Sequence, residues 1–353
     1  MGNQPPRPGS LSELLLTTPL RIFVAGNEAV LVFFVLSGLV LALPATRRAI
    51  DWRAYYPRRM VRLYVPVWGS LVLAVVLIAL VPRVASPERS LWLNAHVGVP
   101  ISEVWHDAYL LDSAGFLNSP LWSLRWEVVF SLLLPLYLVI GRRARSLVVV
   151  KVLLLLGLIG AGTVLGSHPL RYLPIFGIGV LMAFHVEQLS AFGQWMSCHR
   201  HHRVLWTTAA ALTGLLLTAR WVVDGIPERI PILDAVASGS AIVGAALVVV
   251  LAQHWPRARA SMETRPAQWL GARSFSLYLV HEPVIVTFAF LLPATTTPWA
   301  IFAVGPVLAL GVATAFYRYV EAPAHRLAKA VGGRSRRRPG PSAATPRDGV
   351  GPT

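Results

Sequence analysis

Long apolar segments recur through this sequence, and their length limits what the chain can fold into. A helix needs about 20 mostly apolar residues to cross the hydrocarbon core of a bilayer, where all backbone hydrogen bonds must be satisfied within the protein. About nine such segments follow one another, at 27–44, 64–82, 118–140, 146–164, 170–186, 204–223, 232–253, 270–292 and 298–320. The sequence therefore predicts an all-α integral membrane protein with about nine transmembrane helices.

The composition supports the membrane class and argues against two others. Charged residues make up 14% of the sequence, against about 25% in a typical soluble domain, and the mean hydropathy is +0.59. With a single cysteine, Cys198, the chain cannot form an internal disulfide. The net charge of +16 does not indicate nucleic-acid binding, because the basic residues lie in short clusters between apolar segments.

Arginine clusters follow alternate apolar segments and predict the orientation of the chain. The intervening loops are acidic or poor in Lys and Arg, and the clusters lie at 47–62, 142–145, 200–203, 257–265 and 326–338. Basic loops of membrane proteins remain in the cytoplasm. The pattern predicts a multi-pass protein of the cell membrane with a cytoplasmic C-terminus and an external N-terminus.

The two ends of the sequence differ from the membrane region. Residues 1–20 are short and polar and lack the features of a signal peptide, and 21–326 form the predicted membrane domain. Residues 327–353 are rich in Arg, Pro, Gly and Ser, which predicts a basic, disordered cytoplasmic tail. An odd number of spans places the two ends on opposite sides. A further helix ahead of the first span would place both ends in the cytoplasm, and translocation of a short N-terminus is the alternative.

An acidic residue lies near the middle of the third segment. Ionisable groups at membrane depth are costly and mark candidate functional sites. Ser123, Glu127 and Ser131 follow i, i+4, i+8 spacing and form one polar stripe on a helix, whereas Arg125 lies off this stripe. We predict a catalytic role for Glu127 with Ser123 in support. The alternative is a stripe that only holds helices together through hydrogen bonds.

The eighth segment carries a histidine near its middle. Ser274, Tyr278 and His281 share one helix face by i+4 and i+3 spacing, and Pro283 removes a backbone hydrogen bond beside them. Histidine exchanges a proton near neutral pH, as acyl transfer to a hydroxyl requires. We predict that His281 is catalytic and that Ser274 and Tyr278 support it. A histidine that only packs is the alternative.

Three arginines precede the second segment. If its helix begins early, Arg58, Arg59 and Arg62 cluster on one side at the cytoplasmic face of the membrane. Guanidinium groups suit phosphate binding, and coenzyme A is a cytosolic donor that carries several phosphates. We predict that these residues bind the acyl donor. The alternative is that they serve only to orient the chain in the membrane.

A short run of metal-ligating residue types follows the fifth segment, namely Cys198, His199, His201 and His202. No second pair with zinc spacing follows, so we interpret the run as a solvated loop and predict no metal and no tightly bound cofactor.

Several short motifs, in order along most of the chain, resemble those of the acyltransferase-3 family of membrane-bound acyltransferases. The segments are 33–38 (Phe-Phe-Val-Leu-Ser-Gly), 58–66 (Arg-Arg-Met-Val-Arg-Leu-Tyr-Val-Pro), 121–127 (Leu-Trp-Ser-Leu-Arg-Trp-Glu), 171–179 (Arg-Tyr-Leu-Pro-Ile-Phe-Gly-Ile-Gly), 274–283 (Ser-Phe-Ser-Leu-Tyr-Leu-Val-His-Glu-Pro) and 319–323 (Tyr-Val-Glu-Ala-Pro). They add Ser37, Trp122 and Arg171 as supporting polar residues.

The resemblance implies about ten membrane helices and transfer of an acyl group, commonly acetyl, from acyl-CoA as co-substrate. The acceptors that it implies are hydroxyls of sugars, cell-surface glycans, lipids or glycosylated natural products. The expected partners are therefore the donor, the acceptor and membrane lipid, and not nucleic acid.

One feature that the resemblance implies has no counterpart in this sequence. The family's first helix carries an Arg and, roughly eleven residues later, a His held to be essential, but Arg21 has no histidine at that distance. We expect that this first helix is missing and that the sequence as written has little activity. The base would then lie on the missing helix, with Glu127 and His281 as proton partners. A transporter or flippase of a polar lipid or natural product and an inactive binding relative are the alternatives, although no inverted repeat is visible.

Overall fold

The computed structural model describes residues 25–337 except 99, 111–114, 116, 225 and 227–229. Every regular element in this part is helical, which confirms the all-α prediction. The long helices are α2 (Gly26–Arg47), α3 (Trp52–Leu80), α6 (Leu121–Arg142), α7 (Val148–Val164), α8 (His168–Phe184), α9 (Val186–Cys198), α10 (His202–Leu217), α12 (Pro231–His254), α14 (Arg265–Leu291), α15 (Pro298–Phe316) and α16 (Ala322–Arg337). Shorter pieces are α4 (Leu91–Asn94), η2 (Ile101–Glu103), α5 (Val104–Tyr109), η3 (Arg145–Leu147), α11 (Ala219–Asp224), α13 (Pro256–Met262) and the π-helical η4 (Tyr317–Glu321).

Fewer helices qualify as membrane spans than the sequence predicts. Within the described residues, seven are long and apolar enough to cross a membrane, or eight if α8 and α9, which bend by 73° at their junction, form one span. The predicted segment 204–223 falls short because α10 ends at Leu217 after 16 residues. Each predicted segment nevertheless corresponds to a helix, so the difference lies in helix length and continuity.

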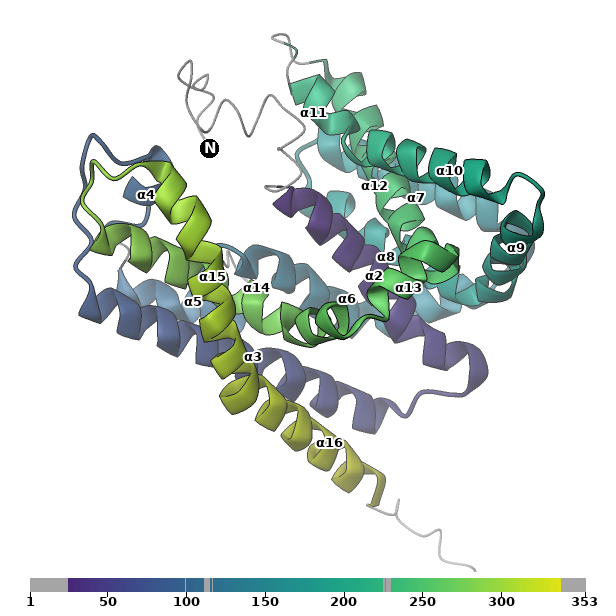
Figure 1. The fold of residues 1–353 in the computed structure, drawn as a ribbon. Coiled ribbons are helices and arrows are strands. Elements are labelled where there is room, and N and C mark those ends of the chain that lie inside the picture. The colour runs from purple at the N-terminus through teal and green to yellow at the C-terminus, as the bar shows by residue number, and fades with distance from the viewer. Residues whose placement is uncertain are drawn as a thin grey trace, which may run out of the picture.

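Two apolar clusters make up most of the core, and α6 contributes to both. One cluster gathers side chains of α2, α6, α8 and α12 around Phe34, Phe130 and Phe176. The other joins α3, α6, α14 and α15, and its buried members include Val67 and Leu279. Figure 1 shows α2 in the middle of the bundle, with α3, α14 and α15 to one side and α7, α8, α10 and α12 to the other.

Helices α2 and α8 touch backbone to backbone. A Cβ atom at Gly38 would lie 2.1 Å from the carbonyl oxygen of Phe176, and one at Gly179 would lie 2.0 Å from the oxygen of Val35. Small residues follow four positions later on both helices, at Ala42 and Ala183. Without water to drive apolar association, helices in lipid rely on such close packing, and small residues permit it. The glycines therefore fix where α2 crosses α8.

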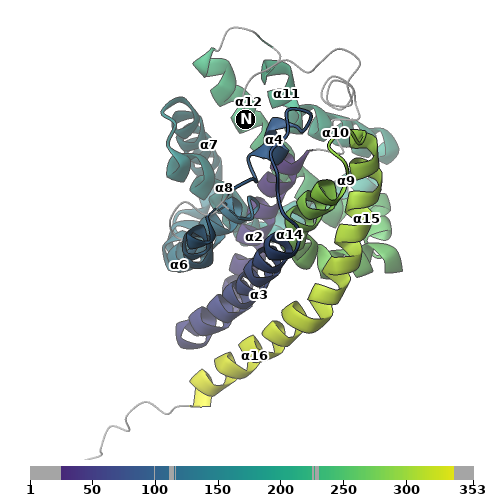
Figure 2. The same cartoon turned by 90° about the vertical axis from the view of Figure 1, so that its left-hand side faces the viewer.

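The C-terminal helix differs from the prediction. Residues 327–337 belong to α16, whereas the composition predicts a disordered tail from 327; residues 338–353 lie outside the described part. Ala324 and Ala328 are buried, and Gly332 lets the helix approach the side chain of Arg58 on α3. Figures 1 and 2 show α16 beside α3, reaching beyond the rest of the bundle. Packing against α3 supplies the order that composition alone does not indicate.

Candidate active site

A buried ion pair joins α3 to α6. The guanidinium of Arg59 donates to the carboxylate of Glu127, and both side chains are nearly inaccessible to solvent. Ser37 of α2 donates to the same carboxylate oxygen at 3.2 Å, and Arg59 Nε donates to Ser131 Oγ at 3.1 Å. Three helices thus meet at one charged group, as the high cost of an isolated buried ion requires.

The predicted polar stripe on α6 is present. Ser123, Glu127 and Ser131 are all buried. Ser131 donates to the backbone oxygen of Glu127 at 2.7 Å, and Ser123 lies 2.6 Å from the hydroxyl of Tyr278 on α14. The second carboxylate oxygen of Glu127, Oε2, accepts no hydrogen bond from the described residues. The stripe therefore holds helices together and also leaves one acceptor unused.

The predicted arginine cluster is divided between two environments. Helix α3 begins at Trp52, capped by the Asp51 side chain, so the expected early start is confirmed. Arg59 points inward to Glu127, whereas Arg58 and Arg62 are exposed. Position 59 lies on the buried face of the helix, and Arg59 and Arg62 line the same cavity, whereas Arg58 lies outside it.

The orientation of His281 follows from its own helix. Its Nδ1 lies 3.1 and 2.9 Å from the backbone oxygens of Leu277 and Tyr278. Carbonyl oxygens only accept hydrogen bonds, so Nδ1 carries the proton in the neutral ring and Nε2 carries the lone pair. Within the described part of the chain, Nε2 contacts no hydrogen-bond donor or acceptor of the protein. This nitrogen can accept a proton from a bound molecule.

Three consecutive cavities run along α14. The Arg62 cavity, about 410 Å³, is lined by Arg62, Glu127 and Glu321 among others. The central cavity, about 420 Å³, adjoins it and shares Phe33, Leu36, Ser274 and Phe275 as lining residues. The Arg89 cavity, about 910 Å³, follows and shares Gly26, Ala29 and His281 with the central one. His281 lies where the second and third cavities meet.

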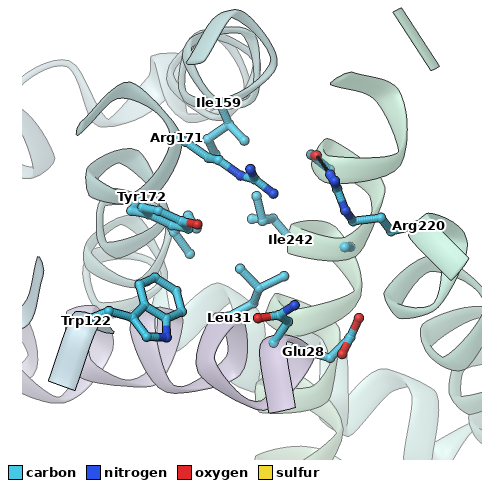
Figure 3. A pocket seen from close by; sticks show the side chains of 12 residues that line it. Glu28, Leu31, Trp122, Ile159, Arg171, Tyr172, Arg220 and Ile242 are labelled. Atoms are coloured by element: carbon cyan, nitrogen blue, oxygen red, sulfur yellow. Dashed lines mark hydrogen bonds between the residues drawn. The ribbon is translucent and has the colours of Figure 1, made fainter. Parts of the chain in front are cut away.

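The predicted face of α14 is thereby confirmed, because Ser274, Tyr278 and His281 all line the central cavity. Trp122 and Arg171 do not join this row and line a separate pocket on the other side of α2, which Figure 3 shows. Arg125, off the polar stripe, lies over the ring of Trp126 at 5.1 Å.

A second buried carboxylate, Glu282, fixes the loop beside His281. Its Oε1 lies 2.9 Å from His96 Nε2, and the carboxylate accepts from the backbone nitrogen of Ser119 at 3.1 Å and from the Ser119 hydroxyl. Nearby, burial lowers the pKa of the Arg83 guanidinium, and the Glu282 charge opposes this shift. No local pattern in the sequence signals this network, because His96 is 186 residues away from Glu282.

A third carboxylate, Glu321, closes the Arg62 cavity. It lies in η4, where the chain forms a π-helical turn between α15 and α16, and π-bulges are frequent at functional sites. Ser276 of α14 donates to it at 2.5 Å, and His325 Nε2 lies 3.6 Å away. The motif 319–323 was the signal that could have identified it.

The fold and the cavities define a class, a multi-pass helical membrane protein with ionisable groups around a row of internal spaces. The family model described as an acyltransferase domain, acyltransferase-3, matches residues 2–318. The chain therefore belongs to the acyltransferase-3 family, which confirms the resemblance. It is an acyltransferase, which decides against the transporter alternative.

Two relatives are similar to this chain. One is the acyltransferase MdmB of Streptomyces mycarofaciens, 26% identical over 294 residues, which cover 76% of this chain and 70% of that protein. The other is the putative peptidoglycan O-acetyltransferase YrhL of Bacillus subtilis (strain 168), 28% identical over 289 residues, which cover 72% of this chain and 43% of that protein. No solved structure matches the chain.

The ion pair gives the first prediction. Arg59→Met should destabilise the protein by about 3–5 kcal/mol, because it leaves the Glu127 charge buried without its partner. Adding Glu127→Leu should recover most of this loss, since both charges are then removed. Thermal unfolding of the purified protein, followed by tryptophan fluorescence, measures both effects. Arg62→Met, an exposed change on the same helix, is the control. A double variant no more stable than Arg59→Met would show that the two charges do not depend on each other.

Proposed function

We propose that this chain moves an acyl group, most simply acetyl, from acyl-CoA to a hydroxyl of a sugar, glycan, lipid or glycosylated natural product. The observation that carries the proposal is the position of His281 Nε2, open to the space where the central and Arg89 cavities meet. A donor entering from the Arg62 cavity and an acceptor entering from the Arg89 cavity would meet at this nitrogen.

The chemistry needs one proton acceptor, and we assign this role to His281 in place of the first-helix histidine that the resemblance implies. A hydroxyl is a weak nucleophile at neutral pH, and a positioned base assists it. His281 Nε2 takes the hydroxyl proton while the oxygen bonds to the thioester carbonyl carbon, and the carbon–sulfur bond breaks. The same nitrogen then returns the proton to the coenzyme A thiolate. Glu127 lines the adjoining Arg62 cavity, and its Oε2 accepts no hydrogen bond from the described residues. This oxygen is a second proton acceptor beside the path of the donor.

The donor side combines the carboxylates of Glu127 and Glu321 with three arginines at 58, 59 and 62, which gives it an excess of positive charge. Arg62 and His325 line the Arg62 cavity, and Arg58 lies close by against α16 at Gly332. Arg58 and Arg62 are exposed and can meet the phosphates of coenzyme A, whereas Arg59 is engaged by Glu127. The donor site therefore rests on Arg58 and Arg62, and Arg59 positions the carboxylate.

The acceptor side is mixed in character. The Arg89 cavity combines charged Glu88 and Arg89 with the Trp92 ring and apolar side chains of α14 and α15. Such a mixture suits hydroxylated rings, which present polar edges and less polar faces. The name of the Bacillus subtilis relative, a putative peptidoglycan O-acetyltransferase, supports a glycan as the acceptor.

His281→Gln is expected to lower the rate of acyl transfer by about 10²- to 10⁴-fold, because the proton acceptor is lost. The assay follows label from radiolabelled acetyl-CoA into a panel of sugar acceptors. His199→Gln, in the exposed connection after α9, is the matched control and should leave the rate unchanged. An unchanged rate in His281→Gln would remove this residue from the chemistry.

Arg58→Ala combined with Arg62→Ala should weaken coenzyme A binding at least about tenfold, and the corresponding Lys variants should recover only part, because bidentate phosphate contact is lost. Isothermal titration with coenzyme A measures the affinity. Arg53→Ala, also exposed near the start of α3, is the control. Equal affinity in the double variant would leave these arginines with an orienting role only.

We also propose that the Arg62 cavity opens to the cytoplasm, as the alternating arginine clusters indicate. Cys198, the single cysteine, is exposed at the end of α9 on the predicted cytoplasmic side. A membrane-impermeant maleimide should label it only after intact spheroplasts are permeabilised. In a Cys198→Ser background, Glu88→Cys should be labelled without permeabilisation. The reverse pattern would invert the orientation.

A further inference from the structure

A separate pocket lies between the N-terminal halves of α2, α8 and α12, beside α11. Its charged lining residues are Glu28, Arg171 and Arg220, and its aromatic walls are Trp122 and Tyr172. Figure 3 shows both arginine side chains extending toward the same space, with Glu28 on the far side. The volume is about 80 Å³, against about 10–15 Å³ for one water on the same kind of measure. The pocket therefore has room for a group of several atoms.

Two of the three charged side chains around this space have polar partners in the protein, and the third does not. Glu28 accepts from the Trp221 indole nitrogen at 2.9 Å. Arg220 donates to Ser238 Oγ at 3.0 Å and lies 3.9 Å from Asp224. The Arg171 guanidinium lies 5.5 Å from the ring of Tyr172 but makes no ion pair or hydrogen bond within the described part of the chain. Among the described residues, this cation facing the pocket thus has no counter-ion.

A half-buried guanidinium without a counter-ion points to an anionic ligand. Charges away from bulk water are normally paired, and ionisable groups at membrane level usually mark substrate sites. The planar guanidinium matches carboxylate and phosphate groups, which it can bind through two parallel hydrogen bonds. Two arginines facing one small space favour such a group over a neutral hydroxyl.

We propose that this pocket binds a carboxylate or phosphate carried by the sugar acceptor, with Arg171 as the main contact and Arg220 as the second. The role of this sugar as the acyl acceptor rests on the proposed function, whereas its binding in the pocket does not. The pocket and the central cavity lie on opposite faces of α2, since Glu28 and Leu31 line one and Ala29 and Phe33 line the other. About one helix diameter, 10–12 Å, thus separates the anion from the reacting hydroxyl, which is more than one sugar ring spans. The anionic group therefore belongs to a sugar unit next to the one that is acylated.

The test uses the purified full chain in nanodiscs of neutral phosphatidylcholine, without acyl donor. Glucuronate, glucose 6-phosphate, glucose and inorganic phosphate are titrated, and binding is read by calorimetry. Glucuronate and glucose 6-phosphate should bind at least tenfold more tightly than glucose, and glucose 6-phosphate more tightly than inorganic phosphate. Arg171→Gln should weaken glucuronate at least tenfold, and Arg171→Lys should restore part. Arg125→Gln, which removes an arginine that lines neither this pocket nor the three cavities along α14, should change nothing.

Three results of the sugar and phosphate titrations would overturn the proposal. These are glucuronate binding no tighter than glucose, glucuronate binding unaffected by Arg171→Gln, and inorganic phosphate binding as tightly as glucose 6-phosphate. Short-chain phosphatidylglycerol that binds through Arg171 while glucuronate does not would assign the pocket to a lipid headgroup and also overturn it. Should Arg171→Gln fail to fold, Arg220→Gln decides, with at least a threefold loss expected.

These experiments distinguish a failure of the proposed pocket from a failure of the proposed function. If the protein binds glucuronate through Arg171 but transfers no acyl group, the proposed function fails and the pocket stands. If it transfers acyl groups but Arg171→Gln leaves the KM for acidic acceptors unchanged, the pocket proposal fails and the function stands.

Discussion

The ion pair between Arg59 and Glu127 is the interaction on which the rest of the bundle depends. Removing each ion from water costs several kcal/mol, which the pair offsets only with good geometry and added hydrogen bonds. Ser37 and Ser131 supply those bonds, from α2 and α6. Because α6 also contributes to both apolar clusters, the pair fixes α3 and α14 relative to α2 and α8. The row of cavities lies along the boundary that this arrangement creates.

Local patterns predicted what depends on local spacing. Hydrophobic segments located the helices, and i, i+4 spacing placed Ser123, Glu127 and Ser131 on one buried face. Contacts between distant segments were beyond such patterns. No local pattern indicates that Glu282 meets His96, or that Arg59 rather than its neighbouring arginines turns inward. Composition also suggested disorder at 327–337, where packing against α3 imposes a helix.

Family membership and geometry contribute different parts of the functional argument. Membership makes the chain an acyltransferase. The geometry supplies candidate positions: an exposed pair of arginines, a histidine nitrogen facing a cavity and a carboxylate with one unused oxygen. The motif residues divide between two sides of α2, because Trp122 and Arg171 line one pocket and Ser274 and His281 line another. One set of sequence motifs thus serves two separate spaces.

The backbone contact between Gly38 and Gly179 is the point about which α2 and α8 would pivot, and the pocket that contains Arg171 lies away from this point. Glu28 lies ten residues from Gly38, and Arg171 lies eight from Gly179, which places both about 12–15 Å from the contact at 1.5 Å of rise per residue. At this distance from the contact, a change of about 4° in the crossing angle of α2 and α8 moves the pocket wall by about 1 Å. A methyl group added at either glycine would therefore reshape a ligand site that it never touches, so selectivity for acidic sugars can be altered from deep within the helix pair.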